Sequence, residues 1–320
     1  MHTSPLYLTE ADVGRLVSVE DALASLEEAF AFWRDPGTTN LPRQRAHLAG
    51  GNFNLMGAAC EKKGVFGLKA YFAGKGGARY HVLLYGADGS GLKAMIEADL
   101  LGALRTGAAS GLATKLMASP QARTLAVIGT GKQARTQVAA ICAVRPIKRM
   151  RVYSRSSERR NAFAFAAADE IGVETEPVDS AKTCVEGADI VVTITKSAHP
   201  VCRSEWVADG AHVNAAGANA ADRRELDSAI VERAALRVTD DRAQAQVEAG
   251  EFRDLVDAGR LAWSDIVELG DLVAGKARGR AAPSDVTLYK SLGIALEDIA
   301  FGELIYRRAV EAGAGRPLTA

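Results

Sequence analysis

The turn GTGKQA (129–134) constrains the fold of this chain more than any other segment. It directly follows the apolar run TLAVIG (124–129), which predicts a buried strand, and it opens a segment (132–144) that predicts a helix. A glycine-rich turn in this position fits the G-x-G-x-x-G/A pattern of dinucleotide-binding βαβ units. The motif therefore predicts a Rossmann domain that binds a nicotinamide dinucleotide and serves an oxidoreductase.

Each small residue of this turn has a physical role. Gly129 permits the tight turn, Gly131 lets the backbone approach a pyrophosphate, and Ala134 allows the helix to pack closely on the strand. The first turn of the helix then offers free N–H groups and the positive end of its dipole to the phosphates. Thr130 and Gln133 are also expected to contact the cofactor. The alternative, a glycine-rich turn without a ligand, is disfavoured by the complete strand–turn–helix context.

Strands and helices continue to alternate after this turn, which is typical of an α/β fold with a parallel sheet. A second helix is expected over 156–170. Thr193 and Thr195, near the end of one expected strand, are predicted to line the cofactor site. The strands expected after the glycine-rich turn are 149–154, 173–178, 189–195, 211–217 and 236–240.

The end of the second strand is where a Rossmann domain selects the ribose of its cofactor. An enzyme that uses NAD usually carries Asp or Glu there, and this carboxylate accepts hydrogen bonds from the ribose hydroxyls. This chain instead has Ser154, Arg155 and Ser156, so no carboxylate repels a 2′-phosphate and a guanidinium is available to bind one. The pattern favours NADP (NADPH) and leaves NAD possible. The alternative interpretation of Arg155 is a solvated loop arginine.

The part of the chain before this α/β pattern predicts a separate α+β domain. Ser18 is expected to cap a helix over 19–33, and Asp99 to cap a second helix over 100–117. A loop is expected at 35–42 and strands at 52–56, 65–72 and 80–85. A last helix over about 291–312 lies outside the α/β pattern and is expected to pack on this first domain, which is then discontinuous. The predicted domains are 1–119 with 293–320, and 120–292.

Charge and cysteine content exclude several classes of protein. Lys plus Arg and Asp plus Glu both number 39, so the basic excess of a nucleic-acid-binding protein is absent. The four cysteines are scattered without a C-x-x-C pair, which disfavours a disulfide framework and a metal site. The first residues lack the features of a signal peptide, and no uncharged apolar run approaches the ~18 residues of a membrane span. We therefore expect a cytoplasmic protein that binds neither nucleic acid nor membrane.

Several stretches, in combination and at their separations, resemble the ornithine cyclodeaminase/μ-crystallin family nearly end to end. That family includes cyclodeaminases, alanine dehydrogenase, ketimine and pyrroline-carboxylate reductases, and μ-crystallin. The resemblance implies a homodimer formed through the first domain and an active site between the two domains. The matching stretches are LPRQRAHL (41–48), NLMGA (54–58), GLKAY (67–71), LRTGAASGLATKLMA (104–118), LAVIGTGKQA (125–134), ADIVVTIT (188–195), HVNAAGANAADRREL (212–226) and TLYKSLGIALEDIAFGELIY (287–306).

Three basic residues match the substrate-binding positions of this family. The resemblance implies that Arg43 and Arg105 hold the α-carboxylate of the substrate and that Lys69 lies beside the reacting carbon. The chemistry agrees, because two guanidiniums can bind one carboxylate and a lysine can exchange a proton with the substrate nitrogen. Two alternatives stay open: Arg45 in the place of Arg43, and a structural ion pair for Arg105.

The chain departs from the cyclodeaminase pattern after the strand over 211–217. Cyclodeaminases carry an aspartate there that is thought to act as a base, whereas this chain has Asn219. An amide cannot take up a proton near neutral pH, so Asn219 is expected to position a ligand by hydrogen bonding. Asp222 is the alternative base if the loop is shifted. His81 is interpreted as a core or dimer-interface residue and not as an acid or base.

The function expected from these residues is reduction of an imine with hydride from NAD(P)H. The substrate class is a cyclic imino acid, such as pyrroline-2-carboxylate, or a ketimine. One alternative is an ornithine cyclodeaminase with catalytic NAD, and another is amino-acid oxidation like that of alanine dehydrogenase. A third, from a different class, is a μ-crystallin-like protein that binds a cofactor or a small effector. Lys69 together with the two arginines favours an enzyme over a binding protein.

Overall fold

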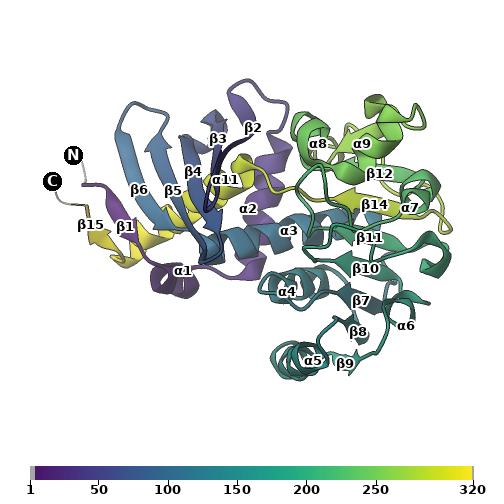
Figure 1. Cartoon of the computed structure of the whole chain (residues 1–320). Coiled ribbons are helices and arrows are strands. Elements are labelled where there is room, and N and C mark those ends of the chain that lie inside the picture. The colour runs from purple at the N-terminus through teal and green to yellow at the C-terminus, as the bar shows by residue number, and fades with distance from the viewer. Residues whose placement is uncertain (1–3, 319–320) are drawn as a thin grey trace. The chain divides into compact units, whose positions relative to one another are not determined.

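The chain divides into two compact units (Figure 1), and the computed structural model describes residues 4–318. The first unit runs up to Arg105 and resumes at Ile294, and the second is Thr106–Gly293. The division falls inside helix α3 (Asp99–Met117), earlier than the predicted boundary after residue 119. The reason is that the second half of α3 bonds within the second unit, where the guanidinium of Arg145 donates to the carbonyl of Thr114.

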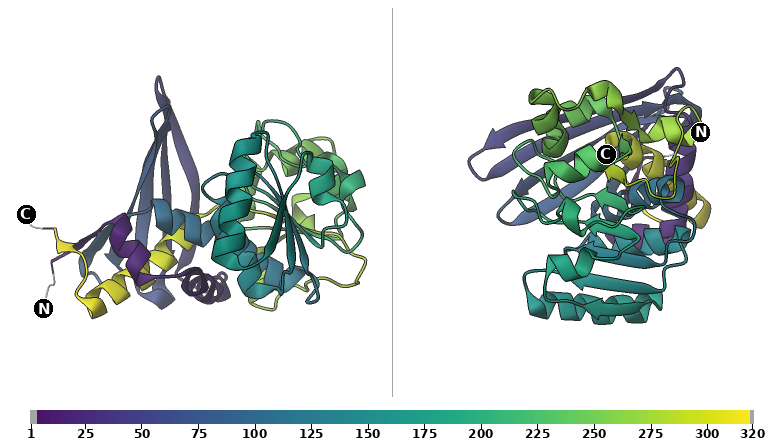
Figure 2. Two further views of the ribbon diagram at one scale, coloured as in Figure 1. Left: turned by 90° about the horizontal axis from the view of Figure 1, so that it is seen from below. Right: turned by 90° about the vertical axis from the view of Figure 1, so that its right-hand side faces the viewer.

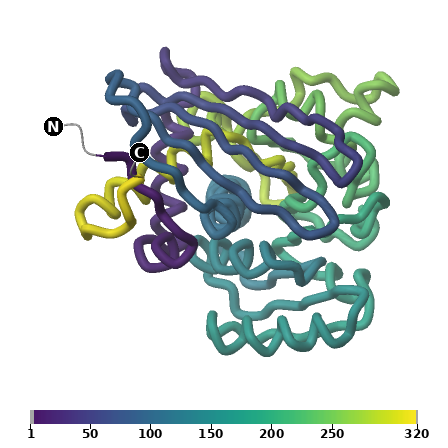
Figure 3. Tube along the Cα trace, turned by 60° about the vertical axis from the view of Figure 1, so that its left-hand side comes forward, coloured from purple at the N-terminus to yellow at the C-terminus, as the bar shows by residue number. Residues whose placement is uncertain are grey.

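The first unit contains a seven-stranded sheet whose order is β15-β1-β6-β5-β4-β3-β2. Neighbouring strands are antiparallel except β1 and β6, which are parallel. Strands β2 to β6 lie side by side as a continuous layer (Figure 3). The strands are β1 (Leu6–Leu8), β2 (Thr38–Leu48), β3 (Gly51–Cys60), β4 (Val65–Gly74), β5 (Gly77–Gly86), β6 (Gly91–Glu97) and β15 (Arg316–Pro317).

Strand β2 corrects the loop that was predicted over 35–42, because the chain is already extended from Thr38. Sequence patterns miss this strand since Pro42 cannot donate to a sheet ladder and the segment is largely polar. The structure accommodates Pro42 at the edge of the sheet, in a register shift between Leu41 and Gln44. Such bulges bend an edge strand and redirect its side chains.

Helices α1 (Glu10–Leu16), α2 (Val19–Ala31) and α11 (Ala295–Ala312) complete the first unit with the short turn η1 (Glu61–Lys63). Ser18 caps α2 as predicted, in a reciprocal capping box with Asp21. Helix α11 packs on β3, β4 and α2, and its buried stripe explains the expected return of the chain to this unit. The predicted helix over 291–312 begins later, at Ala295.

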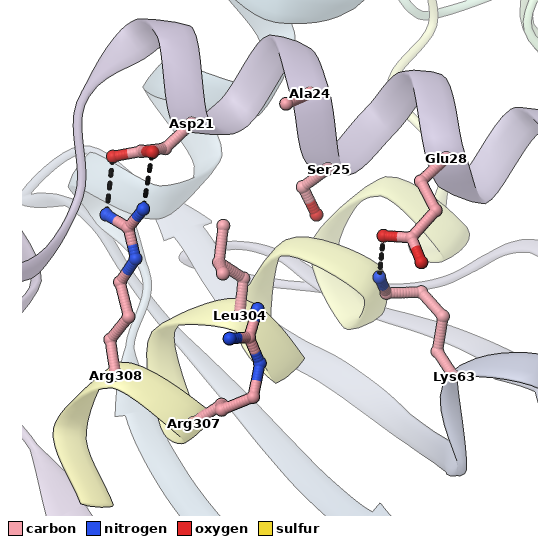
Figure 4. Close-up of a pocket in the computed structure, with 8 residues that line it drawn as sticks. All are labelled: Asp21, Ala24, Ser25, Glu28, Lys63, Leu304, Arg307 and Arg308. Carbon is pink, nitrogen blue, oxygen red and sulfur yellow. Dashed lines mark hydrogen bonds and ion pairs between the residues drawn. The ribbon is translucent and has the colours of Figure 1, made fainter. Parts of the chain in front are cut away.

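Helices α2 and α11 are also joined by polar contacts around a small pocket (Figure 4). Arg308 of α11 forms a bidentate pair with Asp21 of α2, at 2.5 and 2.6 Å. The Oγ of Ser25 donates to the carbonyl of Ala300 over 3.2 Å. Because these contacts run from one helix to the other, we interpret the pocket as part of the packing of α11.

The N-terminus of α3 differs from its prediction. Asp99 was expected to be the N-cap, but it is the first helical residue. The side chain of Glu10 caps the helix instead, accepting from the amides of Asp99 at 2.6 Å and Leu100 at 2.8 Å. A cap supplied by a residue far away in sequence cannot be predicted from local pattern.

The second unit is built on eight parallel strands in the order β13-β12-β14-β11-β10-β7-β8-β9. The order reverses between β7 and β10, which defines the switch point where open α/β sheets bind ligands. The expected strands are present, whereas β13 and β14 were not predicted. The strands are β7 (Thr124–Ile128), β8 (Arg149–Tyr153), β9 (Glu174–Pro177), β10 (Ile190–Thr193), β11 (His212–Ala215), β12 (Leu236–Thr239), β13 (Ile266–Glu268) and β14 (Thr287–Lys290).

Both faces of this sheet are buried beneath helices (Figure 2, left). Successive residues of a strand point to opposite faces, so Leu125 and Val127 enter one core cluster and Ala126 and Ile128 the other. No helix within residues 4–318 is long and apolar enough to cross a membrane. The helices of this unit, apart from α3, are α4 (Ala134–Val144), α5 (Ser157–Ile171), α6 (Ala181–Val185), α7 (Ser228–Arg233), α8 (Arg242–Glu248), α9 (Gly250–Asp257) and α10 (Leu269–Val273), with the turns η2 (Ser204–Trp206) and η3 (Trp263–Asp265).

Candidate active site

The first unit buries three basic side chains in one cluster. Arg43 lies in the bulge of β2, Lys69 lies in β4 opposite Met56, and Arg105 lies in α3. Their exposed fractions are 6%, 3% and 6%, which is rare for such residues unless they are paired or functional. Gly102 of α3 leaves room for the lysine, because a Cβ there would lie 3.1 Å from Lys69 Nζ.

Two carboxylates at the start of α11 bind two members of this cluster, Lys69 and Arg105. Lys69 Nζ donates to Asp298 Oδ1 over 2.9 Å, and Arg105 Nε donates to the same oxygen over 3.0 Å. A second nitrogen of Arg105 donates to Glu297 Oε2 over 2.6 Å. Both carboxylates are buried, and Asp298 Oδ2 has no hydrogen-bond partner among residues 4–318. The ion pair considered for Arg105 is therefore present.

Positive charge gathers in this cluster. The charges of Arg105 and Arg43 both act on the buried ammonium of Lys69, in the same direction and against the charge of Asp298. The three cations outnumber the two carboxylates, Asp298 and Glu297, so these five side chains keep an excess of positive charge away from water and suit an anionic ligand. A carboxylate fits this role, since guanidinium groups bind it with paired hydrogen bonds.

The pKa of Lys69 reflects these surroundings. Burial is the main cause that lowers the pKa of Lys69 to about 8; the charges of Arg105 and Arg43 act in the same direction, and the charge of Asp298 opposes them. Burial raises the pKa of Asp298, but the charges of Arg105 and Lys69 outweigh it and hold this pKa below its usual value. At neutral pH the lysine is therefore mostly an ammonium, and it can release a proton without a large cost.

The geometry distinguishes the two arginines of β2. Arg43 Nε points to Met56 Sδ at 3.3 Å, and its charge acts on Lys69. Arg45 is less buried, and its Nε donates to Asn54 Oδ1 over 3.1 Å. Arg43 is thus the arginine of β2 that the structure brings to Lys69.

Two neighbouring residues of β5 lie on opposite faces of the sheet. The ring of Tyr80, which sequence reasoning missed, lies 5.1 Å from Lys69 Nζ. His81 is paired with Ala70, one register position away from the pair of Lys69 and Val82. Because successive residues of a strand point to opposite faces, His81 lies on the other face of the sheet from Lys69.

In the second unit the predicted cofactor loop lies at the switch point, between β7 and α4. Gly129 has a φ of +114°, and a Cβ there would lie 2.5 Å from the carbonyl oxygen of Ile194, so only glycine fits. At Gly131 a Cβ would meet open space, and Ala134 is fully buried. Thr130 is half-buried, and exposed Gln133 makes no capping bond, so the first amides of α4 have no side-chain cap. This cradle fits a pyrophosphate.

The turn after β8 presents an exposed guanidinium. Ser154 Oγ donates to the carbonyl of Ser156 over 3.0 Å, and Ser156 Oγ caps α5, so both hydroxyls shape the turn. Arg155 is exposed. Sequence reasoning missed Arg160, which donates to the carbonyl of Ser154 over 3.3 Å and also pairs with Asp179.

The three remaining predicted residues lie on or after β10 and β11. Thr193 is fully buried and its hydroxyl has no hydrogen-bond partner among residues 4–318. The hydroxyl of Thr195 donates to Glu225 over 2.8 Å, so its proton is used in a hydrogen bond within the protein and not offered to a cofactor. Asn219 is half-buried in the loop after β11, and the alternative base, Asp222, is exposed.

Comparison with known proteins decides the family. The model of the ornithine cyclodeaminase/mu-crystallin family matches residues 3–313, almost the whole chain. The chain belongs to this family. The resemblance inferred from the motifs is confirmed, and so is the fold class, a Rossmann domain with a second α+β domain.

Members of this family with different activities are similar to the chain. A Δ1-pyrroline-2-carboxylate reductase of Bacillus cereus is 37% identical over 69% of the chain and 68% of its own length. An alanine dehydrogenase of Archaeoglobus fulgidus is 30% identical over 97% of both chains. Among solved structures, Thermococcus litoralis Δ1-pyrroline-2-carboxylate reductase, in complex with NADH and L-proline, has a TM-score of 0.93 at 30% identity and covers 97% of this chain and 99% of its own.

Proposed function

We propose that this member of the ornithine cyclodeaminase/mu-crystallin family is an NAD(P)H-dependent reductase of imines that carry an α-carboxylate. The observation that carries the proposal is the buried cluster of Arg43, Lys69 and Arg105, whose three cations outnumber the two carboxylates paired with them. The relatives from Bacillus and Thermococcus, which are named Δ1-pyrroline-2-carboxylate reductases, support a cyclic imino acid as the substrate class.

In this mechanism each residue of the cluster has a separate task. Arg43 and Arg105 bind the α-carboxylate, and Asp298 and Glu297 hold Arg105 in place for it. Lys69, held as an ammonium by Asp298, donates its proton to the imine nitrogen. The nicotinamide, when bound, supplies the hydride for the imine carbon, so that C=N becomes CH–NH. The loop at Gly129 and Gly131 would hold the pyrophosphate of the cofactor.

Between the two nicotinamide cofactors, we expect the chain to prefer NADPH to NADH. The turn after β8 offers Arg155, and also Arg160, but no carboxylate that would repel a 2′-phosphate. The related Thermococcus structure holds NADH, so we expect the chain to accept NADH as well.

The direct test follows NADPH and NADH absorbance during incubation with pyrroline-2-carboxylate, other cyclic imino acids, and pairs of a keto acid and an amine. Stoichiometric oxidation of the cofactor with formation of the cyclic amino acid is expected. If the protein binds the cofactor but consumes none with any imine, the proposal is wrong and a binding protein is the better description.

Amino-acid oxidation is the second candidate, because the alanine dehydrogenase of Archaeoglobus fulgidus aligns over 97% of both chains. Incubation with L-alanine and NAD⁺ or NADP⁺ tests it.

Cyclodeamination is tested with ornithine and catalytic amounts of the oxidised cofactor. Asn219 lacks the acid–base chemistry of an aspartate, so we expect little proline and ammonia, lower by about 10²–10⁴-fold than with a base in place. Rapid proline formation without net change in cofactor would establish a cyclodeaminase.

A further inference from the structure

Glu225 lies in the second unit, after the loop that follows β11, and has no solvent-exposed surface. Its carboxyl group accepts from donors of two different loops. Oε1 accepts from the amide and hydroxyl of Thr195, at 2.6 and 2.8 Å, in the loop after β10. Oε2 accepts from the amides of Gly217 and Ala218, at 2.7 and 3.2 Å, in the loop after β11. One side chain thus joins two loops beyond the ends of their strands.

The groups around this carboxyl fit its ionised form. Three of the four groups that donate to its oxygens are backbone amides, which cannot accept a hydrogen bond from a protonated carboxyl. Burial raises the pKa of Glu225, and the charge of Lys290 opposes this. A carboxylate with several N–H donors is a stable arrangement inside a protein, because these charge-assisted bonds replace its hydration.

A second layer holds the carboxylate in position. The amide of Glu225 donates to Glu251 Oε1 over 2.9 Å, and Lys290 Nζ approaches the carboxylate of Glu251 at 3.2 Å. Lys290 Nζ also donates to the carbonyl of Ala218 over 2.7 Å. The side chains of Lys290 and Glu251 are 1% exposed, so bulk water does not compete for these bonds.

The two loops approach each other closely at Gly217. A Cβ at Gly217 would lie 2.2 Å from the backbone nitrogen of Thr195 and 2.7 Å from Glu225 Oε1. The ordered pairing of β10 and β11 ends at Thr193 and Ala215, where the amide of Ala216 still donates to the carbonyl of Thr193 over 2.8 Å. Beyond that point the two segments are joined through the carboxylate of Glu225 and no longer by the backbone hydrogen bonds of the sheet.

The loops after β10 and β11 lie on one side of the switch point of the sheet, and the turns after β7 and β8 lie on the other. In such folds a dinucleotide spans the switch point, with one nucleotide over each half of the sheet. The glycine-rich turn after β7 and the ribose-selecting turn after β8 belong to the adenine half. The loops after β10 and β11 therefore belong to the nicotinamide half, where Asn219 follows directly on Ala218.

We propose that Glu225 is a positioning residue for the nicotinamide half of the cofactor site, holding the loops after β10 and β11 in their binding conformation. This inference rests on the proposed function, because it requires a bound nicotinamide dinucleotide. Glu225 is buried beneath the loops and acts through Thr195, Gly217 and Ala218.

The test compares the parent with Glu225→Gln. The amide group keeps the shape of the side chain, but its NH2 cannot accept from amides, so at least one loop loses its partner. We expect the Kd of NADPH to rise roughly ten-fold or more. The Kd of 2′,5′-ADP, which keeps the adenosine and its 2′-phosphate but lacks the nicotinamide nucleotide, should be unchanged. The inference would be overturned if Glu225→Gln lost affinity equally for both ligands, or if it bound NADPH as tightly as the parent does.

Asp189→Asn is the matched control, since Asp189 makes the same kind of bridge at the opposite end of the strands. Its Oδ2 accepts from the amides of Arg123 and Thr124 at 2.8 and 2.9 Å and from the Thr124 hydroxyl at 2.7 Å. Asp189→Asn removes this bridge, which should lower the melting temperature and leave the Kd of both ligands unchanged. A rise in the Kd of NADPH alone in this variant would count against a special role for Glu225.

Hydrogen–deuterium exchange of the parent tests the inference even if Glu225→Gln does not fold. The amides of Thr195, Gly217 and Ala218 should exchange slowly in the cofactor-free protein, because Glu225 already binds them. Fast exchange that slows only with NADPH would show that the cofactor orders the loops, and the inference would be wrong. If the parent binds neither NADPH nor NADH, the proposed function fails as well. If the parent reduces imines while Glu225→Gln binds NADPH normally, only this inference fails.

Discussion

Lys69 is the residue on which the proposed chemistry depends, and its surroundings set its protonation. Sequence motifs and the family resemblance predicted Arg43, Lys69 and Arg105, and the structure brings all three together. They did not predict Asp298 or its neighbour Glu297, because acidic residues near the start of a helix usually face solvent. A signal was nevertheless present, since these two acids interrupt the otherwise apolar segment GIALEDIAFG (293–302).

The alkaline limb of the pH profile should depend on Asp298. If the ammonium of Lys69 is the proton donor, kcat/KM for imine reduction falls as pH rises through about 8, the pKa of Lys69. The charge of Asp298 raises that pKa, so Asp298→Asn should move the limb to lower pH. Glu297→Gln is the control, because Glu297 pairs with Arg105 and should move the limb less. An unchanged limb in Asp298→Asn would exclude Lys69 as the donor.

Arg155 should determine the preference for NADPH. A hydrogen bond to a charged group contributes about 1.5–3 kcal/mol, so Arg155→Ala should raise the KM for NADPH roughly ten-fold or more. The KM for NADH should hardly change, since NADH lacks the 2′-phosphate. Arg159→Ala, an exposed arginine on the first turn of α5, is the matched control. Equal kcat/KM for both cofactors in the parent would contradict the proposed preference.

At the scale of elements, the sequence predicted the α/β half better than the first domain. The βαβ repeat and the glycine-rich turn carry strong local patterns, so strands β7 to β12 were expected close to their observed bounds. Strand β14 was missed because it is short and carries Lys290, whose charge is neutralised by the distant Glu251. Strand β2 was missed because its bulge at Pro42 hides the alternation of a strand.

His212 joins two of these strands and should make stability depend on pH. Its ring, fully buried, bonds Thr287 of β14 at 2.9 Å, and burial lowers its pKa to about 3 from 6.5. Between pH 6.5 and about 3, His212 is therefore protonated in the unfolded chain but neutral in the folded chain. The free energy of unfolding, which is highest above pH 6.5, falls as the pH is lowered toward 3. The contribution of His212 to the slope should approach about 1.4 kcal/mol per pH unit in this window.

Urea unfolding of the parent and His212→Gln at a series of pH values measures that slope. The variant should be less stable at pH 7 but should lose less stability on acidification. His47→Gln is the control, because His47 is exposed and should leave the slope of the parent unchanged. Parallel curves for the parent and His212→Gln would show that His212 is not buried in its neutral form.

For the whole molecule, the outer face of the seven-stranded sheet is the feature that a monomer does not explain. This face is the one opposite Lys69, and several large apolar side chains on it remain exposed. Phe53 pairs with Phe72 across β3 and β4, and the ring of Phe66 stacks on Tyr85 at 5.2 Å. Contiguous exposed apolar surface of this kind marks an interaction site. The exposed residues are Phe53 (40%), Leu55 (38%), Phe66 (44%) and Phe72 (42%).

We predict that this face forms the homodimer interface implied by the family. A symmetric dimer uses the same patch on both subunits, so one charged substitution acts twice and its effect is large. Phe53→Glu should convert the dimer into a monomer in sedimentation equilibrium. Phe165→Glu is the matched control, because Phe165 is 81% exposed on α5 of the second unit and should leave the dimer intact. A monomeric parent, or a Phe53→Glu variant that sediments as the same dimer as the parent, would place the subunit contact elsewhere.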